Sequence, residues 1–553
     1  MHPAAAATAT GIVRQSIDVR RFSWIRPLVS AYSSDFASVA PLFAGNPADP
    51  AAWKETIARV QKSPRDRAAM AKVVAAQLER RGSHTHARAV AGRLADASTV
   101  AVVTGQQAGL FGGALYTLLK AITAIQLARK VSAKHGIPAV PVFWVESEDH
   151  DWEEVRSARV LDEELHLRTV TLGHLEGAGE RPVSTLTLDD GIGDALADLE
   201  RHLAKSEFTD EVLARLRQHY KPGQKMGQAF AAWIDDLLGR HGLVVFEASD
   251  PAAKPLVSDI FKRELEVPCH TACLAKETGE KMRRLGHTPQ VEPAEDSVAL
   301  FYLGHGDRQS IKRREGGGYT IGDQTIDAEA LRAEAVSHPQ RFSPNVLLRP
   351  VIQDRLFPTI CYVAGPSELA YQAQLGEIYG AFGVEVPLLY PRANATLLDS
   401  AALRFLDRSQ LPLESLHTEG ETSLNKLLES QLPPTLEPGL EDLVREISAR
   451  LESLKDVVAS VDPTLGKTVE TTRELMQKPV KTLHAKIIHA SKKKDETLRR
   501  QFTRTQALAF PAGEPQERIV DLPFFLNRYG QAVVDRLLES LPLEMGLHYV
   551  LTL

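Results

Sequence analysis

Hydrophobic and polar positions along residues 99–154 fall into four consecutive blocks. An apolar run at 99–103 leads into a glycine-rich segment at 104–113, and a pattern typical of a helix follows at 114–134. A second apolar run at 137–145 leads into a charged segment at 146–154. Short apolar runs bounded by polar loops indicate buried strands of a parallel sheet. The pattern predicts a strand–helix–strand unit whose polar loops lie at the carboxyl ends of the strands, where open α/β sheets bind ligands.

Strand and helix patterns continue to alternate as far as residue 390. Apolar runs that predict further strands occupy residues 243–246, 298–303, 345–348, 360–363 and 386–390. Helical patterns cover residues 51–94 and 256–285, and strand-like pieces cover 165–172 and 183–188. This alternation predicts an α/β fold with a doubly wound parallel sheet. The long spacings between strands place insertions near residues 160–240 and 255–340.

The pattern changes at about residue 396, where long amphipathic helices begin. Apolar residues that recur at steps of three and four form one helical seam between 438 and 462: Leu443, Ile447, Leu451, Leu454, Val458 and Val461. A second helical pattern covers 468–508, and Pro479 should kink this helix or mark its start. The spacing predicts an antiparallel coiled-coil hairpin, which either supports a homodimer or packs on its own core.

These patterns divide the chain of 553 residues into three parts. We expect an α/β core at 1–395, a helical coiled-coil domain at 396–510, and a segment at 511–553 that returns to the core. The last segment is too short to fold alone.

Charge and cysteine content narrow the classes of partner. The formal net charge is −6, which gives no general attraction for nucleic acid or anionic membranes, and no run approaches the length of a membrane span. The basic run at 492–494 is interpreted as a solvated helix face. Three cysteines and the lack of a signal-peptide pattern predict a cytoplasmic protein. The spacing of Cys269 and Cys273 is unusual for zinc, so we expect no zinc site and no other protein-bound metal.

The glycine-rich segment is the first candidate binding element. Its glycines, Gly105, Gly109, Gly112 and Gly113, do not match the spacing of a dinucleotide fingerprint or of a P-loop. They would let the backbone approach a ligand such as a phosphate, or they would simply form a tight turn. Further candidate binding residues are Gln106 and Gln107, with amide groups, and Tyr116 and Lys120, which share one helix face. Lys120 would reach a phosphate or lie on the surface.

The charged segment is the second candidate, and it contains six carboxylates and one imidazole. Its central residues are Glu148, Asp149, His150 and Asp151. Like charges at this density are unfavourable unless they bind a cation or an amine. His150 could act as a general base toward an amine, whereas a solvated acidic loop would need no ligand. Glu153 and Glu154 are interpreted as the start of a helix.

A third group of candidate residues follows the apolar run at 345–348. Arg349 could bind a carboxylate or phosphate through two hydrogen bonds, or it could form a structural salt bridge with Asp354. Gln353 lies between them in sequence. Downstream, Gly365 marks a turn and Glu368 either contributes to a site or stabilises the start of a helix that also carries Tyr371.

Taken together, these motifs resemble a known family. The residues that carry the resemblance are Thr104-Gly105-Gln106-Gln107, Glu148-Asp149-His150-Asp151, Ser343-Pro344-Asn345 through Arg349-Pro350, Gly365-Pro366-x-Glu368-x-Ala370-Tyr371 and Gln516-Glu517-Arg518. The chain is similar over residues 15–553 to the cysteine-adding ligases of bacillithiol biosynthesis.

The resemblance implies a Rossmann-like core with two connecting insertions, a coiled-coil domain and a homodimer. It implies that cysteine is joined to the amine of glucosaminyl-malate, with ATP activating the cysteine carboxylate and Mg²⁺ accompanying the nucleotide. The loop at Gly105 would then hold phosphates, the charged loop an amine or a metal, and Arg349 the malate carboxylates.

Two other classes of function are compatible with the residues. One is a nucleotide-binding scaffold whose coiled coil recruits partners. The other is an α/β transferase that uses a nucleotide-linked substrate, for which Asp149-His150-Asp151 supplies a weak match to an Asp-x-Asp metal motif.

Overall fold

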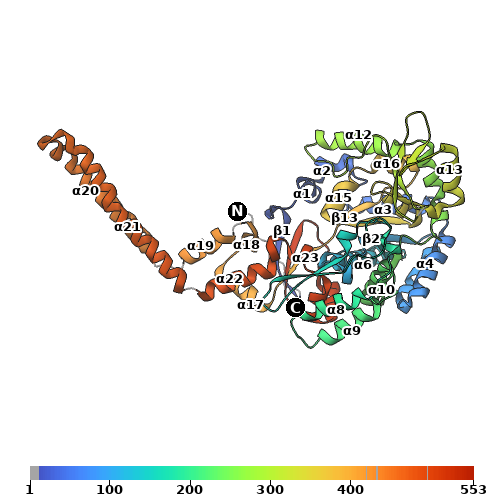
Figure 1. The fold of residues 1–553 in the computed structure, drawn as a ribbon, viewed down its shortest axis with the longest axis horizontal. Coiled ribbons are helices and arrows are strands. Elements are labelled where there is room, and N and C mark those ends of the chain that lie inside the picture. Colours follow the sequence, from blue (N-terminus) through green and yellow to red (C-terminus); the bar gives the residue numbers. More distant parts are fainter. Residues whose placement is uncertain (1–10, 305, 419, 431–433, 495) are drawn as a thin grey trace. The chain divides into compact units, whose positions relative to one another are not determined.

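The computed structural model describes residues 11–304, 306–418, 420–430, 434–494 and 496–553 (Figure 1). The chain forms two compact units. The first comprises Met1–Leu397 together with Pro515–Leu553, and the second comprises Leu398–Glu514. Within the described ranges, none of the helices combines the length and apolar character that crossing a bilayer requires.

A five-stranded parallel sheet forms the centre of the first unit, and it confirms the predicted Rossmann-like fold class. Its spatial order is β13-β12-β2-β3-β6. The strands are β2 (Val100–Gln107), β3 (Ala139–Glu146), β6 (Val244–Glu247), β12 (Thr359–Ala364) and β13 (Leu388–Pro391). The chain proceeds outward from β2 on one side and resumes on its other side with β12. The topological switch point therefore lies between β2 and β12.

Alternating residues of β2 face two helical layers, as the pleat of a strand requires. Val100 and Val102 pack in one apolar cluster with residues of α3 and α6, while Ala101 and Val103 belong to a second cluster with residues of α1, α4 and α16. The helices of these layers are α1 (Pro27–Ser34), α2 (Phe36–Val39), α3 (Pro50–Lys62), α4 (Arg67–Arg81), α5 (Thr85–Gly92), α6 (Leu115–His135), α14 (Arg349–Leu356), α15 (Pro366–Gln372) and α16 (Gly376–Phe382). Burial on both faces explains why the strands read as uninterrupted apolar runs.

Residues 157–238 form a hairpin and helices beside the sheet. The short helix α7 (Trp152–Val155) precedes this segment. The segment itself contains β4 (Ser157–Leu161), β5 (Leu167–Thr171), α8 (Gly191–His202), α9 (Thr209–His219) and α10 (Met226–Leu238). The predicted strand at 183–188 is wrong, because Val183–Thr185 form a 3₁₀ turn. Backbone hydrogen bonds nevertheless join this segment to the start of α10: Leu188 N–H donates to the carbonyl of Gln224, and Met226 N–H donates to the carbonyl of Leu186.

Residues 258–344 build a separate antiparallel sheet with helices. Its strand order is β10-β9-β8-β7-β11. The elements are α11 (Ser258–Glu266), α12 (His270–Arg284), β7 (Ser297–Tyr302), β8 (Gln309–Arg313), β9 (Tyr319–Ile321), β10 (Gln324–Ile326), α13 (Ala328–Ser337) and β11 (Phe342–Pro344).

Two predicted elements have different boundaries in the structure. The helical pattern at 51–94 is three helices, because the chain breaks around Pro64 and ends α4 at Gly82 with a positive φ of 70°. The apolar run at 345–348 is a turn rather than a strand. Asn345 accepts hydrogen bonds from the backbone N–H groups of Leu347 and Leu348, and this arrangement leads directly into α14.

The C-terminal residues pack within the first unit. Strand β15 (Leu547–Leu551) lies between β1 (Val13–Asp18) and β14 (Asn394–Leu397) in a three-stranded sheet. The preceding helices are α23 (Gln516–Ile519), α24 (Leu522–Tyr529) and α25 (Ala532–Ser540). The end of the chain is thus paired with strands from residues 13 and 394 onward.

The second unit contains a long antiparallel helical hairpin (Figure 1). Its helices are α17 (Ser400–Ser409), α18 (Ser415–Thr418), α19 (Gly420–Ser430), α20 (Leu436–Val461), α21 (Gly466–Lys494) and α22 (Glu496–Ala509). Contacts between His484 and Glu437, and between Gln477 and Ser448, give α20 and α21 opposite directions. Pro479 lies inside α21 and does not start it. The side chains at 492–494 lie outside the described part of the structure.

Candidate active site

A cavity of about 430 Å³ opens at the carboxyl ends of β2 and β12, at the topological switch point of the parallel sheet. All of its walls come from the first unit. The predicted residues that line it are Gly105, Gln106, Gln107, Tyr116, Lys120, Asp149, Arg349, Gly365, Glu368 and Tyr371. Segments that are 260 residues apart in sequence meet here because parallel strands bring their carboxyl ends to the same edge.

Lys120 and Glu368 form an ion pair in the wall of the cavity, with 2.6 Å between Nζ and Oε2. Only 1% of Lys120 is exposed, so it does not lie on the surface. Its ammonium is paired with Glu368 and is therefore not free to bind a phosphate. Its ammonium also donates to the carbonyl of Gly105 and to Gln106 Oε1. Glu368 accepts from Gly365 N–H and from the Tyr362 hydroxyl, both at 2.6 Å. Burial favours the protonated carboxyl, but Lys120 and the two hydrogen bonds together hold the pKa of Glu368 below its usual value.

Arg349 is positioned at the first turn of α14. It donates to the Tyr371 hydroxyl at 2.9 Å and to Gln353 Oε1 at 3.1 Å, and its Nε lies 3.7 Å from Glu146. The expected alternative, a salt bridge to Asp354, is wrong. Asp354 accepts instead from the Tyr379 hydroxyl at 2.5 Å and from the Gln353 amide at 2.9 Å, and burial raises its pKa to about 6.

Gln353 and Asp354 are therefore not wall residues. Both are buried, and neither contributes to the lining of the cavity. Gln353 joins Arg349 to Asp354 by accepting from one and donating to the other. This correction assigns both residues to the support of Arg349 rather than to ligand contact.

Two carboxylates of the charged segment after β3, Asp149 and Glu148, are paired with basic residues from elsewhere in the first unit. Asp149 accepts from Arg308 at 3.0 Å and from the Gln107 amide at 2.9 Å. Burial alone would raise the pKa of Asp149, but the guanidinium of Arg308, together with the hydrogen bonds from Gln107 and from the backbone N–H of His150, lowers it. Glu148 is buried against Lys254, and desolvation raises its pKa despite that partner. The predicted concentration of carboxylates is thus partly compensated by separate ion pairs.

His150 and Asp151 lie on the outer side of this loop and do not line the main cavity. Arg308 Nη1 lies 3.0 Å from His150 Nδ1. The same Nδ1 lies 3.3 Å from Asp149 Oδ1, so the imidazole is held between these two residues of the charged wall. Asp151 accepts from the backbone N–H of Glu154 at 3.1 Å and so caps α7. In this arrangement the structure does not bring His150 into position as a base for the main cavity.

Arg308 is a site residue that the sequence analysis missed. It lies between β7 and β8, and its guanidinium carbon is 3.7 Å from the centre of the Phe301 ring. It also donates to the carbonyl of Pro344 at 3.2 Å. A single basic residue in a loop between two strands carries no distinctive pattern. Only the folded arrangement reveals its contact with Asp149.

Glu154 and Arg392 are two further wall residues without a sequence prediction of this role. Arg392 is buried and pairs with Glu517 at 2.9 Å, and it lies 5.6 Å from the centre of the Tyr116 ring. Glu154 belongs to the short helix α7, as expected for a helix-start residue, but it also lines the cavity. Glu154 therefore has both roles: it lies in the first turn of a helix, and its side chain forms part of the cavity wall.

The glycine segment does not form the predicted phosphate cradle. Gly109 and Gly112 do not line the cavity, and their backbone N–H groups donate to carbonyls of the same loop. Leu115 N–H, at the start of α6, donates to the carbonyl of Val520 at 3.0 Å. Gly112 has a φ of +100°, and a Cβ there would lie 2.8 Å from Trp233 Nε1. This turn is shaped by packing rather than by an open anion site.

Gly105, by contrast, lies in the cavity wall for a steric reason. A Cβ at this position would lie 2.7 Å from the carbonyl oxygen of Trp144 on the neighbouring strand. Glycine therefore permits the close approach of β2 and β3 at their carboxyl ends.

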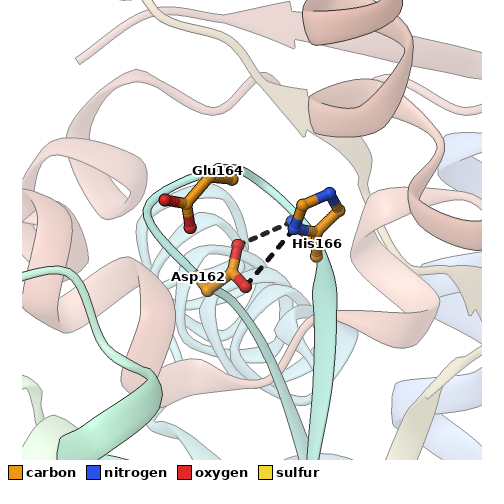
Figure 2. Close-up of side chains that lie close together, drawn as sticks. All are labelled: Asp162, Glu164 and His166. Carbon is orange, nitrogen blue, oxygen red and sulfur yellow. Dashed lines mark hydrogen bonds and ion pairs between the residues drawn. The ribbon is translucent and has the colours of Figure 1, made fainter.

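Among the described residues, the grouping that could hold a metal ion is Asp162, Glu164 and His166 (Figure 2). These residues lie at the turn between β4 and β5 and do not line the cavity. Asp162 already accepts from Arg168 at 2.7 Å and from the backbone N–H of His166 at 2.8 Å. Its carboxylate therefore has a structural role in closing the hairpin. Cys269 and Cys361 are buried, and Cys273 is exposed.

Comparison with known proteins gives matches over nearly the whole chain. Residues 15–393 match the model described as "Bacillithiol biosynthesis BshC, N-terminal Rossmann-like domain", and residues 395–553 match "Bacillithiol biosynthesis BshC, C-terminal coiled-coil domain". A protein of Salinibacter ruber is 34% identical over 527 residues, which cover 94% of this chain and 95% of that protein. A protein of Heliobacterium modesticaldum is 33% identical over 470 residues, which cover 84% and 85%. Both bear the name "Putative cysteine ligase BshC".

Proposed function

The chain belongs to the bacillithiol biosynthesis BshC family, and from this premise we propose that it is a ligase that joins L-cysteine to the amine of glucosaminyl-malate. The name of its relatives supports the cysteine half of this reaction. The observation that carries the proposal is the cavity at the switch point, which combines guanidinium, carboxylate and amide groups. Cysteine and glucosaminyl-malate present the complementary groups, namely ammonium and carboxylate.

Arg349 is the proposed contact for the malate carboxylates. A guanidinium has five N–H donors, and the contacts with Tyr371 and Gln353 occupy only part of them. Those two contacts hold the planar group in one orientation, which favours a bidentate bond to a carboxylate. Burial of the surrounding wall strengthens such a bond relative to one in water.

We propose ATP as the third substrate, because an amide bond forms readily only when the carboxyl oxygen has been converted into a better leaving group. The N–H groups of the glycine loop are engaged within the protein, so the phosphates would contact cationic side chains instead. Arg518 is suited to this role, since it lines the cavity and its guanidinium makes no hydrogen bond or ion pair in the described ranges of the chain. Asp149 and Glu368 already contact cations, so Mg²⁺ would enter on the phosphate oxygens.

The two other functions have less support. A transferase with an Asp-x-Asp metal site would need Asp149 and Asp151 on one ion, but Asp149 contacts Arg308 while Asp151 caps α7. A scaffold would have no use for a cavity with this number of ionic and amide groups. We also propose a cytoplasmic location, where the three cysteines stay reduced, and a homodimer formed through the coiled coil.

The test is an assay with purified protein, L-cysteine, glucosaminyl-malate, ATP and Mg²⁺, in which thiol products are labelled with bimane and identified by mass. We expect bacillithiol only when both protein and ATP are present. The variant Arg349→Ala should raise KM for glucosaminyl-malate at least tenfold, whereas KM for cysteine should change little. Product formation without ATP would contradict the activation step. Lack of product, together with binding of nucleotide, would favour the scaffold.

A further inference from the structure

Four carboxylates line the cavity, and three of them are engaged. Glu146 accepts from the Trp144 indole at 3.1 Å and lies near Arg349, Asp149 contacts Arg308, and Glu368 contacts Lys120. Glu154 is the exception. Within the part of the chain that the structure describes, its carboxylate takes part in no hydrogen bond and no ion pair. A charge left unpaired inside an otherwise compensated wall is available to a ligand.

The surroundings of Glu154 favour a cationic ligand. The titratable groups that interact with it electrostatically are Asp149 and Asp151 from the charged loop and Tyr116 from α6. Partial burial and the two neighbouring aspartates raise the pKa of Glu154 above its usual value. A raised pKa brings a carboxylate closer to the range in which it exchanges protons with an amine, and it also records the lack of a cation at this position.

The backbone of Glu154 is fixed even though its carboxylate is free. Its N–H donates to Asp151 Oδ1, and its neighbours Trp152 and Val155 are buried. The carboxylate is therefore presented from an anchored turn. Preorganisation of this kind keeps a catalytic group within reach of its substrate without a large entropic cost on binding.

We infer that Glu154 binds the amino group of the acceptor sugar and acts as the general base for its attack, an inference that rests on the proposed ligase function. Glu154 first pairs with the ammonium form and removes one proton, so that an N–H bond breaks and an O–H bond forms. The nitrogen lone pair then attacks the activated cysteine carboxyl carbon. The new C–N bond is completed when the phosphate-bearing leaving group departs with its electron pair, and that group accepts the second N–H proton.

The first experiment measures binding, so it does not depend on turnover. Calorimetry compares glucosaminyl-malate with its N-acetylated form, whose nitrogen is an uncharged amide, on wild-type protein, Glu154→Gln and Glu153→Gln. Glu153 is the matched control, because it is adjacent, belongs to the same helix and pairs with Arg156 outside the main cavity. We expect wild type and Glu153→Gln to prefer the amine about tenfold or more, and Glu154→Gln to lose this preference. Retention of the preference in Glu154→Gln overturns the inference.

The second experiment measures turnover against pH. Removal of a general base lowers kcat by about 10²–10⁴-fold, so Glu154→Gln should fall in that range while Glu153→Gln stays within twofold of wild type. The variant should regain rate as pH rises, because a larger share of the amine is then already unprotonated. Glu154→Gln with a wild-type kcat and pH profile would overturn the base assignment and leave the ligase function intact. If wild type neither binds glucosaminyl-malate nor forms product, the proposed function fails and this inference fails with it.

Discussion

At the scale of single residues, the cavity is organised by charge pairing. Lys120 with Glu368 and Asp149 with Arg308 are each formed across elements that are far apart in sequence. Each pair removes two charges from water, which is costly, and the cost is offset only when both partners are present. Removal of one partner therefore leaves an uncompensated charge in the wall.

We expect Lys120→Met to lower the free energy of unfolding of the first unit by about 3 kcal/mol, because it strands the carboxylate of Glu368. The double variant Lys120→Met/Glu368→Gln should recover a large part of that loss, since the neutral amide needs no cation. Urea unfolding of wild type and the three variants completes a double-mutant cycle. Additive effects would show that the two side chains do not interact.

The sequence predicted many of these residues but few of their roles. Gly105 and Gln106 were identified because they follow a strand-like run, and residues at strand ends gather at one edge of a parallel sheet. Lys120 was identified from the helix face that it shares with Tyr116, and Arg349 from the apolar run before it, which is a turn in the structure. Their partners could not be predicted, because a pair such as Asp149 and Arg308 is separated by 159 residues and neither position has a local pattern that specifies the other. Pairing in a folded wall depends on distances that exist only after the insertions have packed.

At the scale of elements, the turn between β2 and α6 is determined by close packing. Gly112→Ala should destabilise the protein by about 2–4 kcal/mol, because it adds backbone strain at φ +100° and a clash with Trp233. Gly136→Ala is the control. It has a similar positive φ at the end of α6 but no atom within 4 Å of the added Cβ, so strain alone should cost about 1 kcal/mol. Thermal unfolding measures both, and equal losses would rule out the packing argument.

Helix α24 begins at a buried carboxyl group that should give the protein a measurable pH dependence. Burial raises the pKa of Asp521 to about 7, and its Oδ2 accepts from Arg159 N–H at 2.7 Å. Between about pH 4 and 7 the folded state keeps this proton while the unfolded state loses it, so this group makes stability fall as pH rises. Above pH 7 its ionisation should lower the free energy of unfolding by about 4 kcal/mol relative to the value below pH 4.

Asp521→Asn should abolish that contribution, because the amide oxygen can still accept the bond from Arg159 and does not ionise. Urea unfolding of both proteins at pH 5 and pH 8 gives the comparison. From pH 5 to pH 8, the free energy of unfolding of the variant should rise by a few kcal/mol relative to that of wild type. Parallel pH dependences would mean that Asp521 titrates as an ordinary surface carboxyl.

Element boundaries could be predicted where a continuous apolar run marks a buried strand. The prediction was wrong where side-chain hydrogen bonds to the backbone form a turn instead. Strands β3 and β12 lie within two residues of their predicted positions, because uninterrupted apolar runs leave little choice. Strand β2 begins within one residue of its prediction but continues to Gln107, four residues into the predicted glycine-rich segment. The run at 345–348 has the same apolar character but forms a turn, since the Asn345 side chain captures the two following N–H groups. Hydrophobicity alone does not distinguish these cases.

At the scale of the whole molecule, the proposed dimer can be tested on the coiled-coil hairpin. The predicted seam of α20 is divided in the structure: Ile447, Leu451 and Val458 are half-buried, whereas Leu443, Leu454 and Val461 are exposed. Val457 is also exposed, at 61%. Apolar side chains left on a helix surface are typical of an interface with a further helix.

We expect Val457→Glu/Val461→Glu to sediment as a monomer, because the variant places charges among these apolar side chains. Ser453→Glu, on an exposed position of the same helix, should remain dimeric. Deletion of residues 440–508 should also give a monomer. A dimer that persists in all three variants would place the interface elsewhere.

The position of β15 has a consequence for the synthesis of this protein on the ribosome. This strand is the middle of its three-stranded sheet, yet its partner β14 is made about 150 residues earlier, and the entire second unit is translated in between. Backbone contacts of this sequence separation form late, because closing so large a loop is entropically costly. During synthesis, β1 and β14 therefore have no partner strand in this sheet until β15 leaves the ribosomal exit tunnel.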